Sequence, residues 1–218
     1  ANAIRWGTMY NFRFDSNRPP QPAQATLGFF KTGTPITVPI EAPAPCAPLS
    51  FASAISRKTH GSAGDFDIDL PLTDEPGVEC RESGGHHTFI VAFSNPLVSG
   101  TASVTSGIGS IAGKPVFEGN TMTLNLSNVT DAQKLTIKLS QVTDSFSQVL
   151  PEMTLSARML IGDANGSRTV NATDITQVKT QSGLPVTAAN FRSDVNASGT
   201  VNGTDVSQVK ASAGNGVP

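Results

Sequence analysis

Apolar and polar residues alternate near the start of the chain. Over residues 3–15, Ile4, Trp6, Thr8, Tyr10, Phe12 and Phe14 fall on one face. A period of two over this length predicts a β-strand. A second alternation at Ala25, Leu27 and Phe29 predicts a partner strand, so residues 1–33 are expected to form an N-terminal β-hairpin segment. Two strands alone are marginal in water, so the aromatic face must be covered by the next domain, by upstream sequence or by a neighbouring molecule.

Prolines dominate the next stretch, residues 34–50. They stand at Pro35, Pro39, Pro43, Pro45 and Pro48. Proline removes a backbone donor and favours extended backbone. The stretch is therefore predicted to be a semi-rigid linker.

Short alternating segments recur at regular intervals over residues 51–159. Phe66, Ile68 and Leu70 alternate with aspartates, and residues 88–93 are almost continuously apolar. Further alternations are centred on Leu124, on Ile137 and on Leu155. About seven strands over roughly 110 residues are typical of an immunoglobulin-like antiparallel sandwich. The fold class is predicted to be mainly β, with helices confined to a small C-terminal module.

Residues 160–218 contain an internal duplication. The segment that begins at Asp163 recurs from Asp194, an offset of 31 residues, with twelve identical positions. Such self-similarity predicts a repeated structural unit.

Both copies place oxygen-bearing residues at positions 1, 3, 5, 7, 9 and 12 of a twelve-residue loop. This spacing allows a loop to surround a hard cation such as Ca²⁺, with a backbone carbonyl at position 7 and a bidentate carboxylate at position 12. Runs of Asp, Asn, Ser and Gly also form ordinary turns, but two copies in register favour metal binding. The predicted ligands are Asp163, Asn165, Ser167, Thr169, Asn171 and Asp174 in loop one, and Asp194, Asn196, Ser198, Thr200, Asn202 and Asp205 in loop two.

A short helix is predicted after each loop. Apolar residues recur three positions apart, at Ile175 and Val178 in the first copy and at Val206 and Val209 in the second. Glycine follows each of these segments and is a common helix terminator.

The duplicated loop and helix, with Asp rather than Glu at position 12, resembles the type I dockerin. The resemblance covers about residues 160–214. It implies a small half EF-hand pair that binds one or two Ca²⁺ ions and docks through its helices onto a cohesin module of another protein. The implied partner-binding residues are Ala172, Thr173, Gln177, Lys179, Gly203, Thr204, Gln208 and Lys210.

The loops depart from the family pattern at two positions. Position 5 is Ser in both, where the family usually has Asp, so each loop offers only two carboxylates. Position 6 is Arg168 in loop one and Gly199 in loop two. Because a non-glycine residue in the left-handed conformation costs about 1 kcal/mol, loop two is expected to be the stronger calcium site.

Composition and charge limit the possible partners. The formal net charge is −2 with 15% charged residues, which gives no electrostatic case for nucleic acid or an anionic membrane. No apolar run approaches the ~18 residues of a membrane span. The chain starts at Ala1 and is rich in Gly, Pro, Ser and Thr, which favours a processed or partial chain of a secreted or cell-surface protein.

Two cysteines, Cys46 and Cys80, are predicted to form a disulfide. Calcium loops and low charge favour an oxidising compartment, where such a bond persists. The alternative is two unrelated thiols, because sequence does not fix connectivity.

No catalytic motif stands out. The sequence contains no G-x-S-x-G elbow, no H-E-x-x-H and no phosphate-binding glycine loop. A carboxylate pair for glycoside hydrolysis is not marked by any pattern. The chain is therefore predicted to be non-enzymatic, with any catalysis in upstream sequence.

The sequence favours a calcium-dependent attachment segment that docks to a cohesin-type module, a setting typical of bacterial polysaccharide degradation. One alternative is a structural subunit that binds another copy of itself by strand addition through the aromatic N-terminal strand. Another is the C-terminal part of a secreted glycoside hydrolase or carbohydrate-binding protein, although no Trp or Tyr follows Tyr10 to stack on a sugar.

Overall fold

The computed structural model describes residues 15–16, 18–29, 32–73 and 75–218, which fall into two units, Ala1–Ala47 and Pro48–Pro218. Residues 3–14 of the predicted aromatic strand lie outside the described residues. Among the helices of the described part, none is long and apolar enough to cross a membrane.

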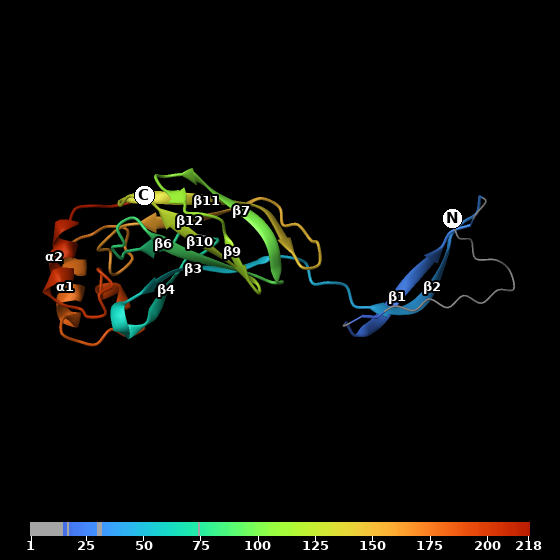
Figure 1. The fold of residues 1–218 in the computed structure, drawn as a ribbon, viewed down its shortest axis with the longest axis horizontal. Coiled ribbons are helices and arrows are strands. Elements are labelled where there is room, and N and C mark those ends of the chain that lie inside the picture. The colour runs from blue at the N-terminus through green and yellow to red at the C-terminus, as the bar shows by residue number, and fades with distance from the viewer. Residues whose placement is uncertain (1–14, 17, 30–31, 74) are drawn as a thin grey trace. The chain divides into compact units, whose positions relative to one another are not determined.

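The first unit contains an antiparallel hairpin of β1 (Pro20–Leu27) and β2 (Ile36–Pro43), in register from Pro20 opposite Pro43 to Leu27 opposite Ile36 (Figure 1). The linker prediction for residues 34–50 is therefore wrong over β2. Prolines are tolerated there because, among the described residues, each strand of this two-stranded ribbon has an unpaired edge that needs no backbone donor. The predicted pairing with residues 3–15 concerns residues outside the described part, and the hairpin that is described pairs β1 with the proline-rich stretch instead.

The second unit is built on two antiparallel sheets, which confirms the predicted mainly-β sandwich with a small helical module. The first sheet has the order β4-β3-β6-β10-β8, with β9 also paired to β10. Its strands are β3 (Phe51–Thr59), β4 (Asp65–Asp69), β6 (His87–Phe93), β8 (Ser110–Ile111), β9 (Val116–Glu118) and β10 (Thr121–Ser127).

The second sheet has the order β5-β12-β11-β7. Its strands are β5 (Val78–Glu79), β7 (Leu97–Ser106), β11 (Gln133–Asp144) and β12 (Met153–Met159). The two-residue β5 runs parallel to β12, and the other pairs are antiparallel.

The core of the sandwich follows the predicted alternation. Alternate residues of β6, β10 and β11 are fully or almost fully buried, because successive side chains of a strand point to opposite faces. These residues are Phe89, Val91, Phe93, Met122, Leu124, Leu126, Leu135, Ile137 and Leu139.

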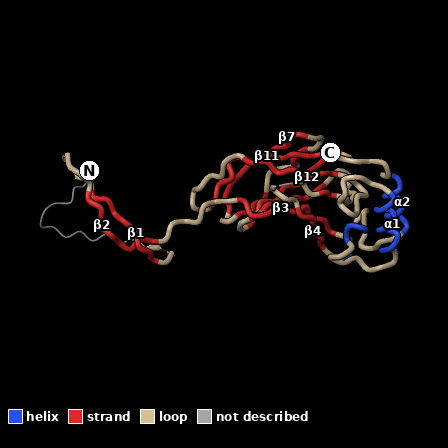
Figure 2. Tube along the Cα trace, turned by 180° about the vertical axis from the view of Figure 1, so that it is seen from behind, coloured by secondary structure: helices blue, strands red, loops and turns tan. Residues whose placement is uncertain are grey.

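Two helices follow the sandwich, α1 (Ala172–Gln181) and α2 (Gly203–Ala211), and they lie together at one end of it (Figure 2). Short 3₁₀ turns, η1 (Gly61–Ala63) and η2 (Phe191–Ser193), precede β4 and loop two. Val170, Val178, Val195 and Val209 form a small core around the helices. Phe66 and Val78 of the sandwich belong to the same core, so the helical module is not packed independently of the sandwich.

Candidate metal centre

Each predicted calcium loop ends in a helix capping box. The Asn171 side chain accepts a hydrogen bond from the Thr173 amide, and the Asp174 carboxylate accepts one from the Asn171 amide at 3.0 Å. Asn202 and Asp205 repeat this arrangement at the start of α2. Positions 9 and 12 of each loop are therefore fixed by the helix that follows, as the capping pattern of residue types favours.

The first carboxylate of loop one is held inside the loop by backbone amides. Asp163 accepts hydrogen bonds from the amides of Ser167 at 2.9 Å and Arg168 at 2.8 Å. Asp174 accepts another from the Asn165 amide at 3.2 Å. The first and last residues of the loop are thus brought to its interior, which is where a loop-bound cation would lie.

Loop two repeats the geometry. Asp194 accepts hydrogen bonds from the amides of Ser198 at 3.0 Å and Gly199 at 2.8 Å, and Asp205 accepts one from the Asn196 amide at 3.2 Å. The equivalence of the two loops follows from the sequence repeat.

Position 6 has a left-handed backbone in both loops. Its φ is 75° at Arg168 and 90° at Gly199. Arg168 thus adopts the conformation that costs a non-glycine residue about 1 kcal/mol. Its guanidinium lies 3.2 Å from Glu75, but both groups are exposed, so this ion pair contributes little.

The four carboxylates at positions 1 and 12 are completely buried. Burial raises the pKa of Asp163, and the charge of Asp174 adds to that rise. The pKa of Asp205 is likewise raised by burial and by the charge of Asp194. A divalent cation between the paired carboxylates would relieve both effects.

The donor set fits a hard, oxygen-preferring cation. In the described part of the chain no three His, Cys, Asp or Glu side chains form a metal-binding group, which agrees with two carboxylates per loop. Neutral oxygens of Asn and Ser and the carbonyls of Thr169 and Thr200 are left to complete the six to eight ligands of Ca²⁺.

The first carboxylate of loop two is hydrogen-bonded to a side chain of the sandwich. His60, which directly follows β3, places its ring Nδ1 2.9 Å from Oδ2 of Asp194, and both side chains are fully buried. The amide of Glu82 donates to the carbonyl of Val195 at 2.7 Å. Burial opposes ionisation of Asp194, but hydrogen bonds from His60 and from the loop amides outweigh it and lower its pKa.

Backbone packing brings loop two against the turn after β3. A Cβ added to Gly61 would lie 2.2 Å from the Ser198 carbonyl oxygen, and one added to Gly199 would lie 2.8 Å from the His60 carbonyl oxygen. Both glycines are therefore required by this close approach.

A buried ion pair supports the contact from the sandwich side. The Arg81 guanidinium donates to both carboxylate oxygens of Glu79, to the Phe66 carbonyl and to the Ser56 carbonyl. Burial opposes ionisation of Glu79, but Arg81 holds its pKa below the usual value. Sequence reasoning did not find His60, Glu79 or Arg81 as site residues, because His60 and Asp194 are 134 positions apart and no local spacing links them.

The predicted disulfide is not formed, since Cys46 and Cys80 are both free thiols. Cys80 is completely buried, its Sγ lies 3.8 Å from the Arg192 carbonyl oxygen, and burial raises the pKa of the thiol to about 11. Cys80 therefore acts as an apolar filler between β5 and the helical module.

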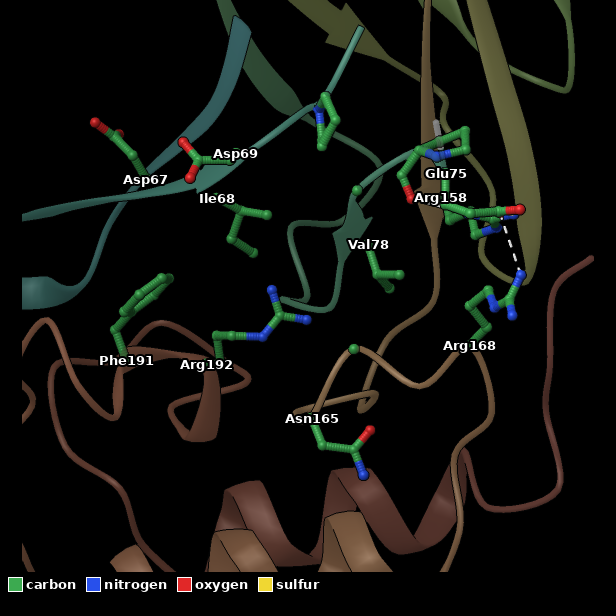
Figure 3. Close-up of a pocket in the computed structure, with 14 residues that line it drawn as sticks. Asp67, Ile68, Asp69, Glu75, Val78, Arg158, Asn165, Arg168, Phe191 and Arg192 are labelled. Atoms are coloured by element: carbon green, nitrogen blue, oxygen red, sulfur yellow. Dashed lines mark hydrogen bonds and ion pairs between the residues drawn. The ribbon is translucent and has the colours of Figure 1, made fainter. Parts of the chain in front are cut away.

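A cleft of about 670 Å³ separates loop one from β4 and β5 (Figure 3). Arg192 lines it and donates to the backbone carbonyls of Asp163 and Ala164. Arg158 and Arg168 both contact Glu75 on its opposite side. Loop one thus faces an open cleft, whereas loop two lies directly on the sandwich.

The predicted partner-binding residues lie on both helices. Ala172, Thr173, Gly203 and Thr204, at the helix starts, are exposed, and so are Lys179 and Lys210. Gln177 donates to the Ala164 carbonyl at 3.2 Å within the module. Gln208 instead donates to the Glu82 carboxylate of the sandwich at 3.4 Å. The equivalent glutamines of the two helices therefore have different neighbours.

Residues 161–212 match the family model of the dockerin type I domain. The match covers both loops and both helices and confirms the resemblance expected for this part of the chain. Comparison with curated proteins and with solved structures gave no significant match.

Proposed function

We propose that this chain is an extracellular attachment segment whose dockerin module binds a cohesin-type partner in a calcium-dependent manner. Dockerin type I modules are non-catalytic, bind calcium and dock to cohesins, and residues 161–212 match that family. The observation that carries the proposal is the pair of loops, each with two buried carboxylates that lead directly into a helix whose first turn is exposed.

We infer that α1, rather than α2, provides the main docking surface. Its first two turns form a shallow depression lined by Ala172, Thr173, Thr176 and Gln177. The corresponding part of α2 adjoins the sandwich through Gln208 and Glu82. Among the described residues, none from the sandwich lines that depression. A partner can therefore pack on α1 without contacting the sandwich there.

Binding of the full chain to a panel of cohesin modules, with calcium and with chelator, tests the proposal. Thr173→Arg on α1 and Thr204→Arg on α2 are matched variants, because both residues are exposed at the same position of the repeat. The proposal expects chelator to abolish binding and Thr173→Arg to weaken it at least tenfold, with little effect of Thr204→Arg. Equal effects would show that both helices dock, and chelator-resistant binding would overturn the calcium-dependent mode.

A second candidate is assembly through the N-terminal hairpin. Leu27, Phe29, Ile36 and Ile40 are exposed in this unit, and an isolated hairpin is marginal in water. Strand addition to a second copy would cover the edges of β1 and β2 that have no partner strand among the described residues. Light scattering over a range of concentrations tests this candidate, and a monomer at every concentration would exclude it.

A further inference from the structure

The carboxylate of Asp194 receives a hydrogen bond from outside its own loop. His60 Nδ1 lies 2.9 Å from Asp194 Oδ2, and neither side chain is exposed to solvent. Asp194 is position 1 of loop two, so its carboxylate is one of only two in that loop. A residue of the sandwich thus contacts a predicted metal ligand of the module.

The neighbours of His60 determine which ring nitrogen carries the proton. Arg81 Nη1 lies 3.3 Å from His60 Nε2, and a guanidinium only donates hydrogen bonds. Nε2 is therefore the acceptor, and Nδ1 carries the hydrogen that is donated to Asp194. Metal-binding groups are commonly oriented by such outer hydrogen bonds.

The ring of His60 is held by two aromatic neighbours. It lies nearly perpendicular to the rings of Phe66 and Phe191, at 5.2 Å and 6.0 Å between ring centroids. Arg81 is itself held by the two carboxylate oxygens of Glu79. The orientation of the Nδ1–H bond is therefore set by Phe66 and Arg81 of the sandwich together with Phe191, which precedes loop two.

Loop one offers an internal comparison. In the described part of the chain, the Asp163 carboxylate accepts hydrogen bonds from the amides of Ser167 and Arg168 but from no side chain. Arg192, which lies beside loop one, donates to the backbone carbonyl of Asp163 and not to its carboxylate. The two loops share their sequence pattern, but of their position 1 aspartates only Asp194 accepts a hydrogen bond from a sandwich side chain in the described structure.

We infer that His60 is a positioning residue for calcium in loop two, so that the sandwich completes the outer shell of that site and makes the two sites unequal. The inference rests on the proposed calcium binding of the loops. His60 holds Asp194 Oδ2 in place and leaves Oδ1 of the same carboxylate for the ion. In the described structure, Oδ1 accepts hydrogen bonds from the amide and the hydroxyl of Ser198. Outer-shell hydrogen bonds of this kind change metal affinity by about 10- to 100-fold.

Calcium titration of the full chain in an Asp163→Asn background, in which loop one is weakened, tests the inference. His60→Leu removes the donor, whereas His60→Asn retains an N–H near the position of Nδ1. His86→Leu is the matched control, because His86 is exposed and contacts neither loop through its side chain in the described structure. We expect affinity to fall at least tenfold in His60→Leu, to recover in part in His60→Asn, and to be unchanged in His86→Leu.

A second measurement uses the wild-type chain, so that its result does not depend on whether a variant folds. Nitrogen NMR of the His60 ring in the wild-type chain reports its tautomer directly. We expect the Nδ1–H form, with ring signals that shift as calcium fills loop two. The Nε2–H form, or ring signals that do not respond to calcium, would overturn the inference, and so would equal affinities of wild type and His60→Leu.

The two proposals fail in different ways. Absence of calcium binding by the unmodified chain would overturn the proposed function of the loops. Calcium binding that is indifferent to His60 would leave that function intact and overturn only the role of His60.

Discussion

Phe66 of β4 and Phe191 of η2 are stacked, with 7° between their ring planes and 5.3 Å between their centroids. One ring belongs to the sandwich and the other directly precedes loop two, so the stack joins the two parts of the unit. Together with the buried His60 and Asp194 pair, it makes the sandwich a support for loop two. The N-terminal half of the repeat has no equivalent contact among the described residues, because loop one faces a cleft.

Removal of calcium is expected to destabilise the sandwich as well as the dockerin module. Each site filled at 100 times its dissociation constant stabilises the folded state by about 2.7 kcal/mol, and the shared core transmits this to the whole Pro48–Pro218 unit. Calorimetry with calcium and with chelator should show one transition that moves to lower temperature with chelator. A sandwich transition that stays in place while only the helices melt would contradict the shared core.

Phe191→Ala is expected to lower the free energy of unfolding by about 2 kcal/mol, below the range for fully buried phenylalanines because the ring is only partly covered. It should also weaken calcium binding in loop two, since the ring supports His60. Urea unfolding with a parallel calcium titration measures both effects. Val98→Ala, at a residue of β7 that is 59% exposed, is the control and should change stability by less than about 0.5 kcal/mol.

The free energy of unfolding should depend on pH through the buried ion pair of Glu79 and Arg81. The pKa of Glu79 is depressed in the folded state, so its contribution is complete above the pKa of an unfolded glutamate, about 4.3. As pH falls below that value the unfolded state gains a proton before the folded state does, and the contribution is lost progressively towards the lower folded pKa.

Glu79→Gln isolates this contribution. The variant leaves Arg81 buried without its carboxylate and should cost about 3–5 kcal/mol at pH 7. Denaturant unfolding of wild type and variant between pH 7 and pH 3 should show the gap narrowing as the solution becomes acidic. A gap that stays constant over this range would mean that Glu79 does not carry a depressed pKa in the folded chain.

Features fixed by neighbouring residues could be predicted from the sequence, and contacts between distant segments could not. The loop conformation, the capping boxes and the left-handed Arg168 all follow from a spacing of a few residues. Strand β2 was not predicted, because a proline-rich stretch does not by itself reveal a ribbon edge that tolerates proline. The contact of His60 with Asp194 depends on packing of the finished sandwich and leaves no periodic signal.

Substitutions at position 6 of each loop should distinguish the effect of backbone strain on calcium binding from the effect of contact with the sandwich. Arg168→Gly removes a left-handed arginine and an exposed ion pair with Glu75, so loop one should gain about 1 kcal/mol, or roughly fivefold in calcium affinity. Gly199→Ala introduces a Cβ 2.8 Å from the His60 carbonyl oxygen at a φ of 90°. It should therefore weaken loop two and loosen its contact with the sandwich.

Calcium titration and thermal unfolding of both variants give the comparison, with wild type as reference. Gly183→Ala is the control for a left-handed glycine, because its φ is 88° but a Cβ there meets nothing within 4 Å. The backbone cost should be similar in Gly183→Ala and Gly199→Ala, so the additional loss in Gly199→Ala measures the contact between loop two and the sandwich. Equal losses in the two variants would show that the close approach of Gly199 to His60 contributes nothing to calcium binding or stability.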